Sequence, residues 1–223
     1  MGKNERIDLL PDTRVVSTAP EWLDVARLRY AACVAEHGKP HPEADHSART
    51  WSDELDQESQ TMAVYEDGRI ASTVRMNWLP SARLSKRCGE TLELRRFSEL
   101  DPRQIAVCSR LAVSNFMRGA VTAKPLFNKI YELGLQRDTV LCLADCARHL
   151  LPLFCFYGFR EYSSPLVDRT AGIVHRVALV LDDLRYLDES RSPFAPIARA
   201  RQVRMRERPW LESMFVAHAM QGS

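Results

Sequence analysis

Hydrophobic and polar positions follow two different periods along this chain, which predicts a mixture of strands and helices. Residues 61–66 and 69–76 are short stretches of alternating character on either side of Asp67-Gly68, the pattern typical of a β-hairpin. Residues 105–113 and 139–144 are almost continuously apolar, as strands buried on both faces are. Residues 172–181 form a late strand. The pattern therefore predicts a sheet at the centre of the fold.

Helical patterns lie between these strands. Thr18-Ala19-Pro20-Glu21 combines a capping box with an early proline, so a helix begins there and runs to about Glu36. A second helix is expected over residues 124–136. A third is expected from an N-cap at Asp145 to Gly158.

The ends of the chain differ in pattern from its middle. We expect residues 1–17 to form an arm, residues 18–188 to form the main domain, and residues 189–223 to form a linker and a helical tail. Residues 79–104 carry prolines and a basic run at 83–87, which predicts a long irregular insertion.

Composition narrows the class of protein. The 223 residues are 45% hydrophobic with a net charge of +2, which suits a globular fold and gives no case for nucleic-acid binding. No stretch has the length of a membrane-spanning helix and the first residues do not resemble a signal peptide, so we expect a cytoplasmic protein. The six cysteines form no C-x-x-C pair, and the histidines of residues 37–61 fit no zinc template, so we predict no metal site.

Two arginines fall on otherwise apolar elements. Arg29 shares one face of the first helix with Trp22, Val25, Ala26 and Cys33, and Arg110 lies inside the strand over 105–113. A buried guanidinium needs an anionic partner, and Asp53 and Asp56 are the candidates for both. The alternative for Arg29 is that its stem packs while its charge reaches water.

The end of that strand and the start of the next helix suit a phosphate. Backbone N–H groups are free where a strand leaves its partner and in the first turn of a helix. Arg118 and Lys124 would add charge, and Gly119, Ala120 and Ala123 would allow a ligand to approach closely. We therefore expect the phosphate of a donor molecule to bind along residues 118–124.

Residues 113–123 resemble the signature of GNAT acyltransferases, in which a strand runs into an Arg- and Gly-rich loop that holds the donor's pyrophosphate. Val121 and Ala123 stand where that family usually has glycine, and Gly158-Phe159 is similar to its terminal Gly-Phe pair. The resemblance implies an α/β (α+β) fold with a mixed, mostly antiparallel central sheet flanked by helices.

A narrower resemblance rests on the order of landmarks from Arg29 through Asp53, Asp56 and Arg75 to Ser109-Arg110. That order is similar to acyl-homoserine-lactone synthases and N-acyl amino acid synthases, over roughly residues 29–181. It implies acceptor binding by Arg29 and Arg75, and catalytic roles for Ser109, Arg110, Asp53 and Asp56. The backbone of Leu111, Ala112 and Val113 would contact the donor thioester. Without that resemblance, the alternative interpretation of Arg75 is a charged residue at an exposed strand end.

The chain departs from these families at the two groups that handle protons. Val107 stands where acyl-homoserine-lactone synthases have a glutamate, and Phe154 where many GNAT enzymes have a tyrosine. Asp53, Asp56, His149 and His175 are the candidates for the missing base.

The resemblance implies an N-acyltransferase that moves a fatty acyl group from acyl carrier protein or acyl-CoA to the amine of an amino acid or similar small molecule, with no tightly bound cofactor. Loss of the two loop glycines favours the carrier protein, and arginines 199–208 offer it a cationic surface. The alternative for the tail is a helix packed on its own domain or on a second copy, as in a homodimer. The alternatives for function are a non-catalytic GNAT-fold protein that binds an acyl carrier or ligand, and an acetyl-CoA-dependent N-acetyltransferase.

Overall fold

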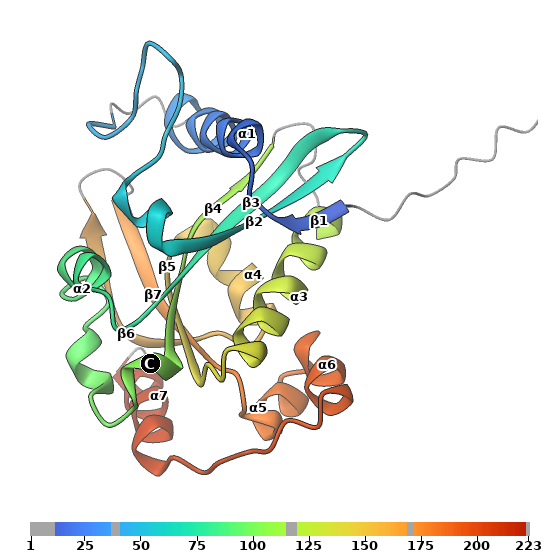
Figure 1. Ribbon diagram of the computed structural model, residues 1–223. Coiled ribbons are helices and arrows are strands. Elements are labelled where there is room, and N and C mark those ends of the chain that lie inside the picture. Colours follow the sequence, from blue (N-terminus) through green and yellow to red (C-terminus); the bar gives the residue numbers. More distant parts are fainter. Residues whose placement is uncertain (1–11, 37–40, 115–119, 169–171, 222–223) are drawn as a thin grey trace, which may run out of the picture.

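The protein is built around one seven-stranded sheet with helices on both faces (Figure 1). The computed structural model describes residues 12–36, 41–114, 120–168 and 172–221. The strand order is β1-β2-β3-β4-β5-β7-β6, and every neighbouring pair is antiparallel except β4 and β5. The predicted mixed, mostly antiparallel sheet is therefore confirmed. The strands are β1 (Asp12–Val15), β2 (Ser59–Glu66), β3 (Arg69–Trp78), β4 (Ile105–Val113), β5 (Leu141–Ala147), β6 (Arg160–Asp168) and β7 (Gly172–Val180).

The helices divide between the two faces according to which core cluster they join. α3, α4, α5 and α6 pack with the residues of β3, β4 and β5 that point to one face, and α2 and α7 pack with those that point to the other. α1 covers the hairpin on the same side as α2. The helices are α1 (Ala19–Arg29), α2 (Ala82–Cys88), α3 (Ala120–Gln136), α4 (Leu151–Phe156), α5 (Leu184–Glu189), α6 (Phe194–Ala200) and α7 (Pro209–Gln221).

Local sequence explains the first helix and the hairpin. The Thr18 side chain accepts from the backbone N–H of Glu21, and the Glu21 side chain accepts from the N–H of Thr18, so the predicted capping box is present. α1 passes at Arg29 into a π-helical segment, Tyr30–Ala35. Asp67 and Gly68 both have positive φ, at 50° and 73°, as a type I′ hairpin turn requires.

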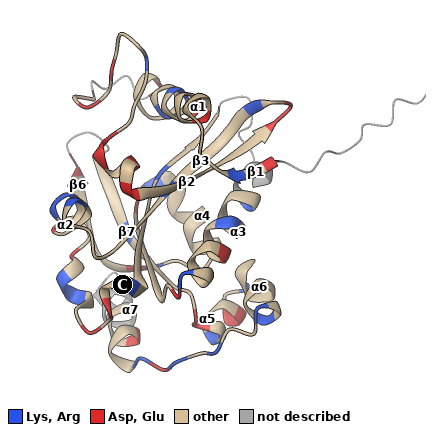
Figure 2. Ribbon diagram, viewed as in Figure 1, with Lys and Arg blue, Asp and Glu red and all other residues tan. Residues whose placement is uncertain are grey.

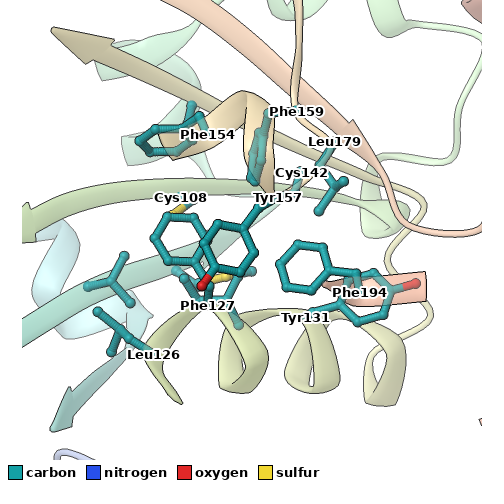
Figure 3. Packing of buried hydrophobic residues seen from close by; sticks show 14 of the residues in the cluster. Cys108, Leu126, Phe127, Tyr131, Cys142, Phe154, Tyr157, Phe159, Leu179 and Phe194 are labelled. Carbon is teal, nitrogen blue, oxygen red and sulfur yellow. The ribbon is translucent and has the colours of Figure 1, made fainter. Parts of the chain in front are cut away.

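Aromatic rings fill the core between the sheet and α3 (Figure 3). Phe127 stacks on Tyr157 at 4.3 Å and Tyr131 stacks on Phe194 at 4.3 Å, with each pair of rings nearly parallel. Phe194 is fully buried although it lies near the start of residues 189–223, which are predicted to form a linker and a helical tail. α6 begins at Phe194, so part of that stretch belongs to the core.

The C-terminal tail also packs on its own domain, the alternative stated above. Leu211 and Phe215 of α7 are buried in the second core cluster, and α7 lies beside β6. Arg208 donates to Asp182 at 2.9 and 3.0 Å, so this arginine is engaged within the chain. The division of the chain at residues 17 and 188 stays a prediction.

Several predicted boundaries are wrong. α3 begins at Ala120 and not at Lys124, because Pro125 is accommodated inside its second turn, where it removes only one backbone hydrogen bond. Asp145 does not cap a helix but lies in β5, and His149 lies in a 3₁₀ turn, Arg148–Leu150, before the short α4. Gly158, with φ of 95°, follows α4 as predicted.

Other elements are absent from the sequence prediction. Residues 79–104 contain α2 and two 3₁₀ turns, Leu94–Phe97 and Pro102–Gln104, so this insertion is more regular than expected. β6 completes the sheet edge, and β1 lies within the predicted arm, where it pairs with β2. No helix in the described parts of the chain is long and apolar enough to cross a membrane.

Candidate functional site

The centre of the sheet opens into a fork between β4 and β5. The two strands pair in parallel only from Ile105 and Leu141 to Cys108 and Ala144. Beyond Cys108, β4 pairs with β3 alone, while β5 continues with β7 alone. Among the described strands, each of the two therefore has a backbone edge without a strand partner inside the fork.

Alternation along β4 identifies the amides on that edge. Ser114 donates its backbone N–H to Ala71 on β3, and Ala112 pairs with Thr73. The N–H groups of Leu111 and Val113 therefore point to the opposite edge, into the fork. Three backbone positions are expected at the donor thioester. The N–H groups of Leu111 and Val113 point into the fork, and the N–H group of Ala112 points toward β3.

The expected phosphate-binding residues are only partly described. Arg118 and Gly119 lie outside the described residues. The backbone of Ala120 and Ala123 forms the first turn of α3, where N–H groups lack helical partners, and Lys124 is exposed beside them. The earlier start of α3 thus brings a helix N-terminus closer to the end of β4 than the sequence predicts.

Next to the fork, arginines and aspartates form a buried ionic network on the face covered by α1. Arg29 donates to Asp56 at 2.8 Å. Arg75 donates to both carboxylates, at 2.5 Å to Asp53 and 3.1 Å to Asp56, and Arg110 donates to the other oxygen of Asp53 at 2.5 Å. The partners expected for Arg29 and Arg110 from sequence are thus the partners observed.

The loop before β2 fixes both carboxylates. Asp53 caps a 3₁₀ turn, Glu54–Glu58, by accepting from the N–H of Leu55 at 3.0 Å. Asp56 accepts in return from the N–H of Asp53 at 2.9 Å. This capping box orients both carboxylates through backbone hydrogen bonds that do not depend on the arginines.

Arg110 occupies a strained position in the sheet. Its φ is +58°, and the register between β3 and β4 shifts around it, so it forms a bulge. The guanidinium lies 3.6 Å from the ring centroid of Trp51 and 3.6 Å from a carboxylate oxygen of Glu43. A non-glycine residue in this conformation persists only when its surroundings hold it, here Trp51, Glu43 and Asp53.

Three members of the network are not predicted from sequence. Trp51 stacks under Arg110, and Arg87 donates to Glu43 at 2.5 Å. Glu43 belongs to residues 37–61, whose histidines fit no zinc template, and Arg87 belongs to the basic run at 83–87. In Figure 2 the acidic segment before β2 lies beside α2 and its basic residues.

The described network contains four guanidinium groups and three carboxylates, a net charge of +1. Burial alone would raise the pKa of Asp53, but Arg75 and Arg110 outweigh it and hold that pKa well below its usual range. Burial would also raise the pKa of Asp56, but Arg29 and Arg75 outweigh it and lower that pKa. Both carboxylates therefore stay ionised, and a carboxylate of such low pKa is a weak proton acceptor near neutral pH.

Accessibility separates the arginines. The side chains of Arg29 and Arg75 are 1% and 2% exposed, whereas those of Arg110 and Arg87 are 13% and 31% exposed. Direct contact of Arg29 or Arg75 with an acceptor stays a prediction, and their burial favours a supporting role. Arg110 and Arg87 are thus the more accessible of the four arginines.

The remaining candidate groups lie around this network. The Ser109 hydroxyl accepts from Nε of Arg75 at 3.1 Å, which ties β4 to the ionic network. His175 on β7 contacts Glu161 through Nδ1 at 2.6 Å, and His149 is exposed. Val107 and Phe154, at the two positions of departure, are buried and apolar.

Other features of the surface do not coincide with the network. No group of three His, Cys, Asp or Glu side chains suited to a metal ion occurs among the residues described. One hollow of about 690 Å³ lies near Thr139 and Arg204, and another of about 470 Å³ near Leu28 and Ser114. The register of β4 and β5, rather than a hollow, therefore locates the candidate site.

Comparison with known proteins rests on structure alone, since no protein-family model and no curated protein matches the chain. An N-acyl amino acid synthase from uncultured soil microbes, FeeM, superposes with a TM-score of 0.63 over 84% of this chain and 97% of its own, at 14% identity. The CoA-dependent acyl-homoserine lactone synthase BjaI gives 0.63 over 86% and 99%, at 17% identity. The chain has a GNAT-like fold. An acyl-CoA N-acyltransferase from Pseudomonas aeruginosa also shares it, with a TM-score of 0.53 over 76% and 99%, at 17% identity.

Proposed function

We propose that the protein is an N-acyltransferase that moves a fatty acyl group from acyl carrier protein or acyl-CoA to the amine of an amino acid or similar small molecule. Its structural neighbours include an N-acyl amino acid synthase and an acyl-homoserine lactone synthase, which supports this class of reaction. At 14–17% identity they support the fold, so the chemistry must rest on the chain's own residues.

The fork between β4 and β5 is the observation that carries the proposal. Leu111 and Val113 direct N–H groups into it, and the first turn of α3 follows a few residues along the chain. An extended donor arm that carries amides would pair with these backbone groups and direct its phosphate toward the helix N-terminus. Arg118 and Gly119 would complete that phosphate site.

The reaction needs a neutral amine and a polarised thioester carbonyl. The amine lone pair attacks the carbonyl carbon, the C–N bond forms, and charge develops on the oxygen, where the N–H groups of Leu111 and Val113 would stabilise it. Collapse of this intermediate breaks the C–S bond. The thiolate leaves with the electron pair and takes up a proton released from the nitrogen.

The ionic network would form the wall on the acceptor side. Its net charge of +1 suits an acceptor that carries a carboxylate, and Arg110 and Arg87 are its reachable cations. Arg29, Arg75, Asp53 and Asp56 would hold Arg110 in place, and Ser109 would link the wall to β4. Arg29 and Arg75 would thus support acceptor binding without touching the acceptor. Asp53 and Asp56 would position Arg110 and would not act as bases.

The purified protein should be incubated with a panel of acyl-CoA thioesters, or with acyl carrier protein loaded with the same chains, and a mixture of amino acids. We expect N-acyl amino acids by mass spectrometry and stoichiometric release of free thiol. The variant Arg110→Lys should lose most of this activity, while Arg83→Lys, at an exposed pair with Glu58, should retain it.

The products decide between the alternatives. Transfer only from the loaded carrier protein would identify the carrier protein as the donor. Transfer only from acyl-CoA would exclude the carrier protein as the donor. Binding of the thioester without product would indicate a non-catalytic binding protein, and acetylated products alone would indicate an acetyltransferase. Either result refutes fatty acyl transfer.

A further inference from the structure

Asp145 is a carboxylate that neither the ionic network nor the core accounts for. It lies in β5, its side chain is exposed, and no hydrogen bond or ion pair to another side chain is found for it among the described residues. Its neighbours on the same strand, Ala144 and Cys146, are buried. A lone carboxylate between buried residues at the middle of a sheet calls for an explanation.

The strand register places Asp145 at the opening of the fork. Ala144 is the last residue of β5 that pairs with β4, and its partner is Cys108. Continuing that register by one residue sets Asp145 opposite Ser109. The two residues therefore stand on the two sides of the fork at the point where the strands separate.

Alternation shows which face Asp145 occupies. Cys142, Ala144 and Cys146 belong to the core under α3, whereas Leu141 and Leu143 belong to the cluster under α2 and α7. Asp145 follows Leu141 and Leu143 in this alternation. On β4, Ile105 and Val107 belong to that same cluster, and Ser109 follows them. Asp145 thus shares a face with Ser109 and with the Arg75 guanidinium that donates to it.

We propose that Asp145 is the proton acceptor for the acceptor amine, in a reaction that rests on the function proposed above. The acceptor ammonium would give one proton to the Asp145 carboxylate, directly or through one water, and the freed lone pair would attack the thioester carbon. Asp145 would return that proton to solvent. The second proton leaves the nitrogen as the C–S bond breaks and converts the departing thiolate to a thiol.

The electrostatic surroundings favour this role over that of Asp53. Although its side chain is exposed, the protein that surrounds the fork displaces part of the water around the Asp145 carboxylate and so raises its pKa; Asp168 on β6 adds to the increase, and Arg110 on β4 opposes it. A carboxylate whose pKa is raised is a stronger base than one whose pKa is lowered. Asp145 is therefore better suited than Asp53 to accept a proton from the acceptor amine.

The other polar groups on this face are already engaged or are weak acids. Arg176 pairs across the strand with Asp145, but its guanidinium donates to Glu93 and to the carbonyl of Ser164. Burial raises the pKa of Cys88 on α2 to about 11, with Asp145 as the second cause. Burial likewise raises the pKa of Tyr162 on β6.

The decisive variant is Asp145→Asn, which keeps the shape of the side chain and removes its basicity. Because the side chain is exposed and has no side-chain partner among the described residues, the variant should fold. Asp138→Asn is the matched control, since Asp138 is an exposed carboxylate before the other end of β5, at φ of 52°, which asparagine tolerates.

We expect kcat/KM of Asp145→Asn to fall by about 10²- to 10⁴-fold with an ordinary amine acceptor, the range typical of general base catalysis. The acidic limb of the pH profile of kcat/KM should disappear in the variant and persist in Asp138→Asn. With a hydroxylamine analogue of the acceptor, which is already neutral near neutral pH, the variant should recover to within a few-fold of the unmodified protein.

Asp145→Asn with unchanged kcat/KM and an unchanged pH profile would overturn the assignment while leaving acyl transfer established. An equal loss with both acceptors would also overturn it, because a residue that only shapes the site does not distinguish a charged amine from a neutral one. If the unmodified protein acylates neither acceptor, the proposed function fails, and the role of Asp145 fails with it.

Discussion

Removing either partner of the buried Arg29 and Asp56 pair should have unequal consequences for stability. The two side chains are 1% and 8% exposed, so each charge is costly without a partner. Asp56→Asn leaves Arg29 with no carboxylate within the described network and raises the net charge there from +1 to +2. Arg29→Met leaves Asp56 with Arg75 at 3.1 Å and with the N–H of Asp53.

The expected magnitudes follow from these contacts. Asp56→Asn should lower the free energy of unfolding by about 3–5 kcal/mol, the usual cost of an uncompensated buried charge. Arg29→Met should lower it by about 1.5–3 kcal/mol, the cost of one charged hydrogen bond. In a chain of this length each kcal/mol corresponds to about 2–4 °C in Tm.

Urea denaturation followed by circular dichroism and by tryptophan fluorescence would measure both variants at neutral pH. Arg83→Met is the matched control, because its pair with Glu58 joins side chains that are 44% and 38% exposed and should be worth less than about 1 kcal/mol. Equal costs for the two buried variants, or a greater cost for Arg29→Met, would refute this account of the network.

Three further predictions follow from the site and the core. Arg110→Lys keeps the charge but loses the planar group that lies over Trp51, so kcat/KM should fall at least about 10-fold while the fold survives; an unchanged value in steady-state assays would contradict the placement of the site. The pKa values of Asp53 and Asp56 are lowered on folding, so the stability they contribute is present above their unfolded pKa and is lost as pH falls through their folded values. Acid titration should therefore show a smaller decline in unfolding free energy for Asp53→Asn than for the unmodified protein, and parallel curves would argue against it. Phe194→Ala should cost about 3–5 kcal/mol in thermal or chemical denaturation, and a cost below about 1 kcal/mol would mean that α6 is not part of the core.

The ion pairs could be predicted from the sequence because they follow from regular structure. A charge on the apolar stripe of a helix or inside a buried strand needs a partner, and Arg29 and Arg110 each find one at Asp56 and Asp53. The hairpin around Asp67-Gly68 can also be predicted from the sequence, since only a few residue types adopt two consecutive positive φ angles.

Glu43, Trp51 and Arg87 could not be placed in the same way. Glu43 and Trp51 lie on irregular backbone, where no periodicity indicates which way a side chain points, and Arg87 lies on a helix that the sequence does not reveal. The sequence predicts a helix cap at Asp145, but an aspartate after an apolar run fits both a cap and a strand position where pairing ends. Only the register with β4 distinguishes the two.

The wide turn at Tyr30–Ala35 limits how the first helix can change in length. It contains one residue more than an α-helical turn would hold, and Ala32 and Val34 are still buried, Ala32 against Ala112 of β4. Deleting a single residue there would swing everything after it by about 100° around the helix axis and carry those two side chains into water. Insertions and deletions in homologous chains should therefore gather after Glu36 and leave the spacing between Arg29 and Val34 untouched.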